Sequence, residues 1–279
     1  MSIKIYKPTT STLRHKIGID YRKDGIKKVK LPKSLLGGVL KRQGRSSQTG
    51  RITVRRRGGG VKKLYRKVDF KGKDGRVPGV VETLIYDPNR SAFLALVKYS
   101  DGDKRLLLAT KDMKAGFKID ENLDVIREGT RLPLEQIPVG VEVHNIELNP
   151  GQGGKLVRSA GVSAFLAGIV GGFAQIKLPS GELRLINKKC KATVGKIGNE
   201  DVRNVKLGKA GSSRQKGIRP SVTGKAMNAV DHPHGGGKAH QSIGMAGQKT
   251  KWGKPAMGVR TRKRKNPTNK FIIKRRYNK

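Results

Sequence analysis

The residue types best suited to chemistry lie in the segment DHPHGGG, which runs from Asp231 to Gly237. His232 or His234 could serve as a general base oriented by Asp231, because imidazole titrates near neutral pH. The same side chains could ligate a metal ion. Both interpretations require a rigid scaffold, and the flanking sequence shows no sign of one. We favour a third interpretation, in which this is backbone that lies against a partner and whose path proline and glycine fix.

Two glycine-lysine segments invite comparison with the phosphate-binding loop of NTPases, which requires Ser or Thr directly after its Gly-Lys pair. In NPGQGGKLVRSAG (149–161), Leu156 follows Lys155. In HGGGKA (234–239), Ala239 follows Lys238. Neither segment matches the NTPase pattern, although their backbone amides could still hold phosphate groups of RNA.

The net charge of the chain indicates the class of partner. The 279 residues include 62 Lys and Arg but only 20 Asp and Glu, for a formal net charge of +42. Self-repulsion on this scale opposes compaction, whereas binding to a polyanion releases counterions and turns the charge into affinity. Nucleic acid is therefore the leading partner. An anionic membrane surface would require a long amphipathic basic helix, which 37 Gly and 12 Pro disfavour.

The acidic residues mark the part of the chain that folds on its own. Residues 69–201 contain 17 of the 20 acids together with 20 basic residues, so this body is nearly neutral. The two ends contain the other 42 basic residues and three acids. We therefore predict a folded body between two cationic arms, which only a partner would order. A fragment of residues 60–200 is expected to fold without either complete arm.

The body has the pattern of a mainly β protein with two small barrels. Three β-rich runs in 79–110 are separated by turn residues at 87–89 and 100–102, and 171–187 reads as a hairpin with its turn at 179–181. Residues 139–148 form another strand candidate, and 126–138 is a plausible junction. The predicted organisation is a basic N-terminal arm (1–41), a first barrel (42–125), a second barrel (126–200) and an extended basic C-terminal arm (201–279).

Other features narrow the class of protein. A single cysteine, Cys190, excludes an intramolecular disulfide and suits a reducing compartment. No apolar run reaches the length of a membrane span, and MSIKIYKPTT is not the pattern of a secretory signal. We expect no cofactor and no metal. Aromatic residues make up only 5%, which favours contacts to phosphate, 2′-hydroxyl and RNA shape over base stacking.

The segment GRITVRRRGGGVKKLYRK (50–67) is the strongest local signal for RNA binding. Three arginines precede three glycines, and glycine allows a phosphate to approach the backbone closely. A merely solvated loop is the alternative, but a glycine triplet would add nothing to it.

Five motifs in register resemble the universal family of large-ribosomal-subunit protein two, in its bacterial or organellar form. They are GRITVRRRGGG (50–60), YDPNRSA (86–92), IPVGVEVHNIELNPGQGGKLVRSAG (137–161), AMNAVDHPHGGG (226–237) and TRKRKNPTNKFIIKRR (261–276). The resemblance implies an OB-fold barrel followed by an SH3-like barrel, with long irregular basic arms. Two positions depart from the family pattern: Val61 stands where histidine is usual, and Ala229 where proline is usual.

The resemblance also implies the binding residues. Arg90 and Arg158 would be primary rRNA contacts whose replacement weakens binding with little effect on folding, and His232 and His234 would lie near the peptidyl-transferase centre. The full expected set of rRNA contacts is Arg55, Arg56, Arg57, Gly58, Gly59, Gly60, Lys62, Lys71, Lys73, Arg90, Lys155, Arg158, Arg214, Arg219, His232, His234, Lys238, Arg262, Lys263, Arg264 and Lys265.

The function implied is that of a structural, non-enzymatic protein of the large subunit that binds its (23S-type) rRNA. Further expected partners are neighbouring ribosomal proteins, the small subunit through an intersubunit bridge, and tRNA indirectly, without a membrane or a homo-oligomer. The location would be the cytoplasmic ribosome, with an organellar ribosome as the other option. An RNA-acting enzyme using His232 or His234 and a general DNA-binding protein are the alternatives.

Overall fold

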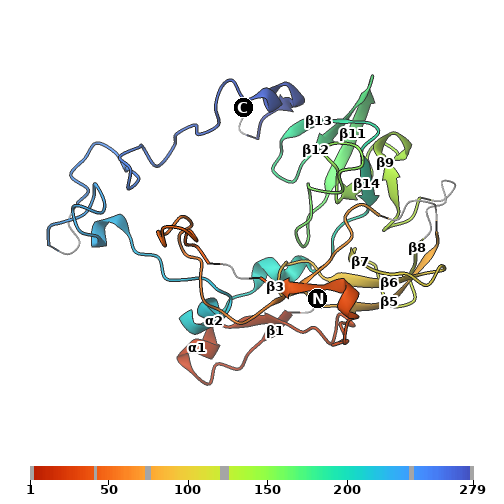
Figure 1. Ribbon diagram of the computed structural model, residues 1–279, viewed down its shortest axis with the longest axis horizontal. Coiled ribbons are helices and arrows are strands. Elements are labelled where there is room, and N and C mark those ends of the chain that lie inside the picture. Colours follow the sequence, from red (N-terminus) through yellow and green to blue (C-terminus); the bar gives the residue numbers. More distant parts are fainter. Residues whose placement is uncertain (1–2, 41–42, 73–76, 120–125, 239–241, 277–279) are drawn as a thin grey trace. The chain divides into compact units, whose positions relative to one another are not determined.

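The computed structural model describes residues 3–40, 43–72, 77–119, 126–238 and 242–276 (Figure 1). The chain divides into two compact units. Unit 1 comprises residues 1–41, 62–210 and 268–279, and unit 2 comprises residues 42–61 and 211–267. All strands named below belong to unit 1.

The first large sheet of unit 1 contains four antiparallel strands in the order β7-β6-β5-β8. The strands are β5 (Gly79–Ile85), β6 (Leu94–Tyr99), β7 (Lys104–Leu108) and β8 (Lys118–Ile119). The three β-rich runs predicted in 79–110 are confirmed, with the turns where the turn residues placed them. Gly102 has a φ of 85°, a conformation that favours glycine.

The second large sheet contains seven antiparallel strands in the order β15-β13-β12-β11-β10-β14-β9. The strands are β9 (Arg131–Pro133), β10 (Glu142–His144), β11 (Ala164–Val170), β12 (Phe173–Lys177), β13 (Leu183–Asn187), β14 (Lys191–Val194) and β15 (Ile272–Lys274). The predicted hairpin in 171–187 is confirmed as β12 and β13.

Two segments of this sheet differ from the sequence interpretation. The stretch 126–138, read as a junction, contains β9, and its Leu132, Leu134 and Ile137 are buried in the core. The C-terminal arm returns to the sheet, because β15 pairs with β13 at the sheet edge. Both strands are only three residues long, too short for an alternating pattern to stand out in the sequence.

Smaller elements complete unit 1. β1 (Ile3–Ile5) pairs with β2 (Ile17–Ile19), β3 (Leu36–Val39) pairs with β4 (Leu64–Arg66), α1 spans Ser11–Arg14, and three short 3-10 helices are η1 (Lys33–Leu35), η2 (Leu134–Gln136) and η3 (Glu200–Asn204). The side chain of Thr10 caps α1 by accepting a hydrogen bond from the Leu13 amide.

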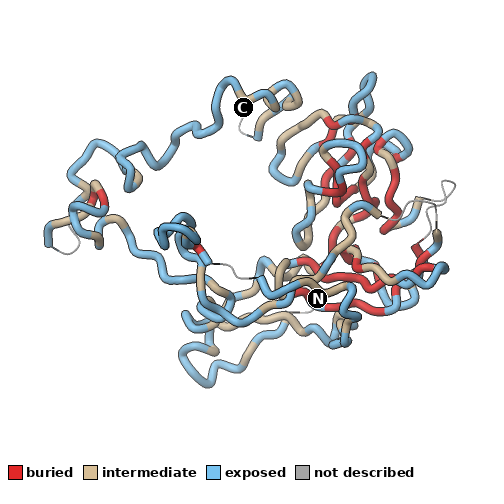
Figure 2. The backbone as a smooth tube through the Cα atoms, in the orientation of Figure 1, coloured by how far each residue is buried: buried red, intermediate tan, exposed pale blue. Residues whose placement is uncertain are grey.

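The core of unit 1 consists of three clusters of buried residues (Figure 2). One lies in the seven-stranded sheet, and the other two involve the four-stranded sheet. In β6, Ala95 and Val97 belong to one cluster while Leu94 and Leu96 belong to the other, because successive side chains point to opposite faces of a strand. The N-terminal arm adds apolar side chains to the same two clusters: Ile19, Ile26, Leu31 and Leu35.

Unit 2 is built differently, from loops and short helices. Its elements are α2 (Ala210–Gln215), which begins at the unit boundary, η4 (Gly224–Ala226) and η5 (Pro267–Phe271), which ends in unit 1. Among its described residues none belongs to a hydrophobic core cluster, and most are exposed. Within the described parts of the chain, no helix is long and apolar enough to span a bilayer.

The chain is mainly β, as predicted, and its antiparallel sheets agree with an OB-fold barrel followed by an SH3-like barrel.

Candidate rRNA interface

Arg90 and Arg158 converge on one aromatic ring in unit 1. The guanidinium carbon of Arg90 lies 5.4 Å from the centroid of the Phe70 ring, and that of Arg158 lies 4.6 Å from it. Arg90 follows β5 of the four-stranded sheet, whereas Arg158 precedes β11 of the seven-stranded sheet. Cation–π contacts therefore gather two cations from different sheets at one place, where a single stretch of phosphate backbone could meet both.

The buried carboxylate of Asp87 fixes the position of Arg90. Its Oδ2 accepts a 2.7 Å hydrogen bond from Arg90 Nε, and its Oδ1 accepts bonds from the Asn89 amide at 2.9 Å and from Arg66 Nη1 at 3.5 Å. The side chain of Asp87 is 0% exposed and that of Arg90 only 17% exposed. Arg90 is thus part of the structure of unit 1 as well as a candidate contact, which changes the expectation that its replacement leaves folding little altered.

A second buried ion pair organises the loop that precedes Arg158. Arg131 Nη2 donates to Glu147 Oε1 at 2.9 Å, and the two side chains are 7% and 1% exposed. Glu147 also accepts hydrogen bonds from the amides of Gly151 (3.2 Å) and Gly153 (3.1 Å). These two amides point inward to a carboxylate, so they are not available to the RNA phosphates that the sequence left possible for this segment. The loop instead presents the exposed side chains of Lys155 and Arg158.

The RRRGGG segment of unit 2 packs against its own chain. The Gly58 amide donates to the Gly217 carbonyl at 3.2 Å, and the Arg219 amide donates to the Arg56 carbonyl at 3.0 Å. At Gly60, where φ is 92°, a Cβ atom would lie 2.8 Å from the backbone nitrogen of Gly217. The close approach predicted for a phosphate is therefore made by the protein backbone. Arg55, Arg56 and Arg57 remain exposed.

The segment from Asp231 to Gly237 forms a hydrogen-bonded turn that buries both histidines, each 8% exposed. The Gly235 amide donates to the His232 carbonyl at 2.8 Å. The His234 amide donates to His232 Nδ1 at 3.1 Å, and the Lys249 amide donates to His234 Nε2 at 3.0 Å. The expectation that this arm has no scaffold of its own is thus wrong, because the loop is closed by internal bonds.

These bonds occupy one nitrogen of each ring. A ring nitrogen that accepts an amide proton uses its lone pair in that bond, so the lone pairs of His232 Nδ1 and His234 Nε2 are already used. Desolvation, with His234 and Arg55 nearby, also lowers the pKa of His232 from its usual value. The hydrogen bonds described for the rings involve backbone amides, not the exposed Asp231. A general base needs its lone pair free for the incoming proton, and this arrangement does not provide it.

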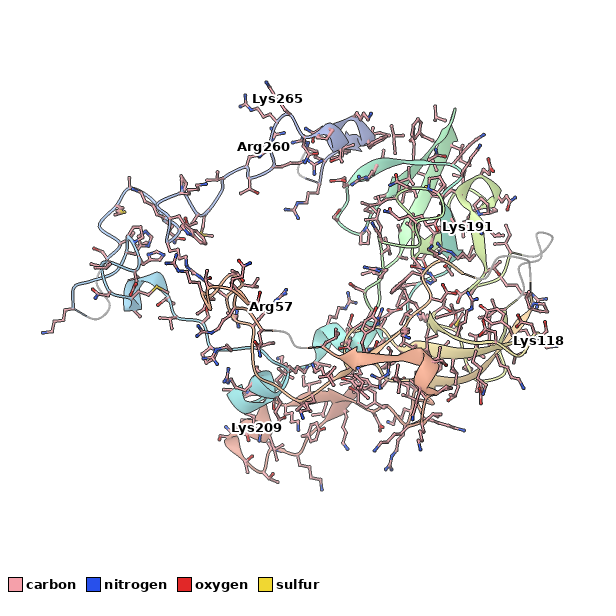
Figure 3. All side chains as sticks on the ribbon, in the orientation of Figure 1. Arg57, Lys118, Lys191, Lys209, Arg260 and Lys265 are labelled. Carbon is pink, nitrogen blue, oxygen red and sulfur yellow. The ribbon has the colours of Figure 1, made fainter. Side chains whose placement is uncertain are left out.

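The remaining predicted contacts are exposed residues of both units. Figure 3 labels Arg57 and Lys265 of the predicted set, and also Arg260, which is outside that set. Lys73 lies outside the described residues. The other exposed members of the predicted set are Lys62, Lys71, Arg214, Arg219, Lys238, Arg262, Lys263, Arg264 and Lys265. Within the described residues, no group of three or more His, Cys, Asp or Glu side chains could hold a metal ion.

Two family models match the chain. Residues 32–120 match the RNA-binding N-terminal domain of ribosomal proteins L2, and residues 127–253 match the C-terminal domain of the same proteins. The chain belongs to the ribosomal L2 family. It is therefore a structural ribosomal protein of the large subunit that binds RNA, and the Arg90–Phe70–Arg158 cluster includes residues of both matched domains.

Several residues that shape this L2-family interface were missed in the sequence. Phe70 and Arg131 lie outside the five motifs, and Asp87 and Glu147 lie inside motifs that do not reveal their ion-pair partners. The DPN turn was a usable signal for Asp87, because Asp at the start of a turn accepts amide bonds. Glu147 had no comparable signal, because the strand candidate 139–148 also contains Glu142, His144 and Asn145.

Proposed function

We propose that this L2-family chain makes its primary contact with large-subunit rRNA at the Arg90–Phe70–Arg158 cluster. The observation that carries the proposal is that guanidinium groups from two sheets meet on one ring, each held in place by bonds within unit 1. Lys71 and Lys155 are exposed in the adjoining segments. Preorganised arginines lose little side-chain entropy on binding and offer planar donors to phosphate.

The basic segments of unit 2 extend this contact along the RNA. Arg55, Arg56 and Arg57 are exposed on a loop whose glycines are committed to internal packing. Through these contacts the protein supports assembly, association with the small subunit through an intersubunit bridge, tRNA binding and the peptidyl-transferase region. It acts as a monomer beside neighbouring ribosomal proteins, in cytoplasmic ribosomes.

An affinity series on the full-length protein tests the primary contact. Arg158→Gln removes one exposed charge at the cluster, and the matched control Lys118→Gln removes one exposed charge from β8. We expect Arg158→Gln to weaken binding to a large-subunit rRNA transcript by about 1–3 kcal/mol. In footprinting, the nucleotides near this contact should lose their protection. Lys118→Gln should have only the small effect of one non-specific charge. Equal losses in the two variants would remove Arg158 from the primary contact.

The histidine turn has a positioning role in this proposal, because both rings accept backbone amides. His234→Ala should impair assembly or tRNA placement before it affects chemistry. Single-turnover peptide-bond formation on fully assembled variant ribosomes separates the two roles. A loss of about 10²–10⁴-fold with rRNA structure and tRNA occupancy intact would indicate a general base.

A further inference from the structure

We propose that Trp252 in unit 2 is a stacking site for one unpaired nucleobase of rRNA, and that His234 positions it. The inference rests on the proposed rRNA binding and adds the chemical class that this site recognises. Trp252 is the only tryptophan of the chain, and it is 71% exposed. An indole left this exposed keeps most of its apolar surface available to a partner.

A closed turn holds Trp252 at its apex. The Gly253 amide donates to the Thr250 carbonyl at 2.9 Å, and the Thr250 amide donates to the Lys254 carbonyl at 2.7 Å. The Ala256 amide donates to the Gln248 carbonyl at 2.9 Å, which ties the two ends of the turn together. Gly253 has a φ of 76°, a conformation that side chains other than glycine rarely adopt. The backbone therefore fixes where the indole is presented.

The charges around the indole select the ligand. Lys251 Nζ lies 4.8 Å from the ring centroid, and the guanidinium carbon of Arg55 lies 5.7 Å from it. Asp231 is the only acid between residues 202 and 279. A free phosphate would make no favourable contact with the indole, and an apolar protein surface would make none with the two cations. A nucleotide uses both, because its base has a π face and its phosphate is anionic.

One hydrogen bond joins this turn to the histidine loop, because the Lys249 amide donates to His234 Nε2. Within the loop, the His234 amide donates to His232 Nδ1. His234 is thus a positioning residue whose ring anchors the turn that carries Trp252. The scarcity of aromatic residues, which argued against base stacking in the sequence, is no obstacle to one base stacking on one tryptophan.

Tryptophan fluorescence of the full-length protein reports on Trp252 alone, since there is no other tryptophan. Binding of a large-subunit rRNA transcript should quench this emission, because a stacked base contacts the indole directly. Heparin, a polyanion without bases, should bind the same cations but quench little of the Trp252 emission. Filter binding under the same conditions measures rRNA affinity independently of the fluorescence.

Substitutions separate stacking from charge. Trp252→Leu should raise the Kd for rRNA about 5- to 150-fold, the range for loss of one base–aromatic stack, with an unchanged salt dependence. Trp252→Phe should recover part of that loss. Lys251→Gln should instead lower the slope of log K against log salt by about one. Met257→Leu is the matched control, because Met257 is equally apolar and 73% exposed.

His234 is tested by rescue, with rRNA-induced quenching of Trp252 as the readout. His234→Ala removes the acceptor for the Lys249 amide and should reduce the quenching even at saturating rRNA. His234→Gln places an amide oxygen near the lost Nε2 and should restore most of it.

The outcomes distinguish this inference from the proposed function. Saturating rRNA that leaves Trp252 emission unchanged would refute the stacking site and leave rRNA binding intact. Heparin quenching as strong as that of rRNA, or equal Kd values for wild type and Trp252→Leu, would refute it as well. No preference for the rRNA transcript over a DNA duplex of equal length would overturn both proposals together. Equal quenching in His234→Ala and wild type would remove the positioning role.

Discussion

Replacing Arg90 and Arg158 by alanine, one at a time, should separate a structural arginine from a binding arginine within the same cluster. Both guanidinium groups lie over Phe70. Their remaining contacts differ, because Arg90 pairs with the fully buried Asp87, whereas Arg158 is exposed and donates one 3.3 Å bond to the Gly154 carbonyl. We expect both variants to lose rRNA affinity, and only Arg90→Ala to lose much stability.

The size of the difference follows from the contacts. Arg90→Ala removes a 2.7 Å charge-assisted bond, worth about 1.5–3 kcal/mol, and a cation–π contact worth about 0.5–1 kcal/mol. Arg66 and the Asn89 amide still satisfy part of the Asp87 carboxylate, which keeps the loss below that of a fully orphaned buried charge. We estimate a loss of about 2–4 kcal/mol for Arg90→Ala and about 1 kcal/mol for Arg158→Ala.

Urea denaturation of the full-length proteins, followed by circular dichroism, measures this difference. With an m value of about 2–3 kcal/mol/M, Arg90→Ala should lower the midpoint by about 1 M and Arg158→Ala by a few tenths. Arg90→Lys is an informative control, because it keeps the charge but loses the planar donor fork. Equal midpoints for the two alanine variants would show that the Asp87–Arg90 pair contributes nothing to stability, and the reasoning from burial would fail.

Three further predictions concern unit 1. Burial lowers the pKa of His144 to about 4, and its Nδ1 bonds to the Gly195 carbonyl at 2.8 Å. Between about pH 6.5 and pH 4 the unfolded chain therefore binds a proton at His144 that the folded chain does not bind. The free energy of unfolding should fall by up to about 3 kcal/mol as the pH drops through this range. The urea midpoint of His144→Asn should depend less on pH than that of the wild type. Glu147→Gln removes the carboxylate that pairs with the buried guanidinium of Arg131 and should cost about 3–5 kcal/mol in the same assay; a change below about 1 kcal/mol would contradict the assigned pair. A fragment of residues 60–200 lacks Ile19, Ile26, Leu31 and Leu35, so its thermal midpoint should lie below that of a fragment of residues 1–210, as calorimetry can check.

The parts of the fold that the sequence predicted are those with local patterns. β5, β6 and β7 alternate or run apolar between recognisable turns, and β12 and β13 flank a turn at Gly181, whose φ is 85°. β9 was missed because Arg131 and Pro133 flank its one fully apolar residue. β15 was missed because its place depends on pairing with β13, from which it is separated by a long stretch of chain that includes residues 211–267 of unit 2. Such pairing depends on tertiary context rather than propensity.

The candidate site was predicted in its residues but not in its geometry. Arg90 and Arg158 followed from resemblance to the family, while Phe70, the ring that brings them together, belongs to no motif. The glycine triplet was recognised as a place of close backbone approach. Glycine permits such an approach but does not determine which group makes the contact. In the structure it is Gly217 that lies against Gly60.

The histidine turn shows why residue types and spacing alone leave a general base and a metal ligand open beside the favoured interpretation of backbone that lies against a partner. The bond from the His234 amide to His232 Nδ1 is local and follows from their spacing of two residues. The bond from the Lys249 amide to His234 Nε2 joins residues fifteen positions apart, and no local sequence pattern predicts it. Yet that second bond decides the chemistry, because it occupies the lone pair that a base or a metal ligand would need. The direction of one hydrogen bond therefore assigns His234 to holding the backbone that carries Trp252.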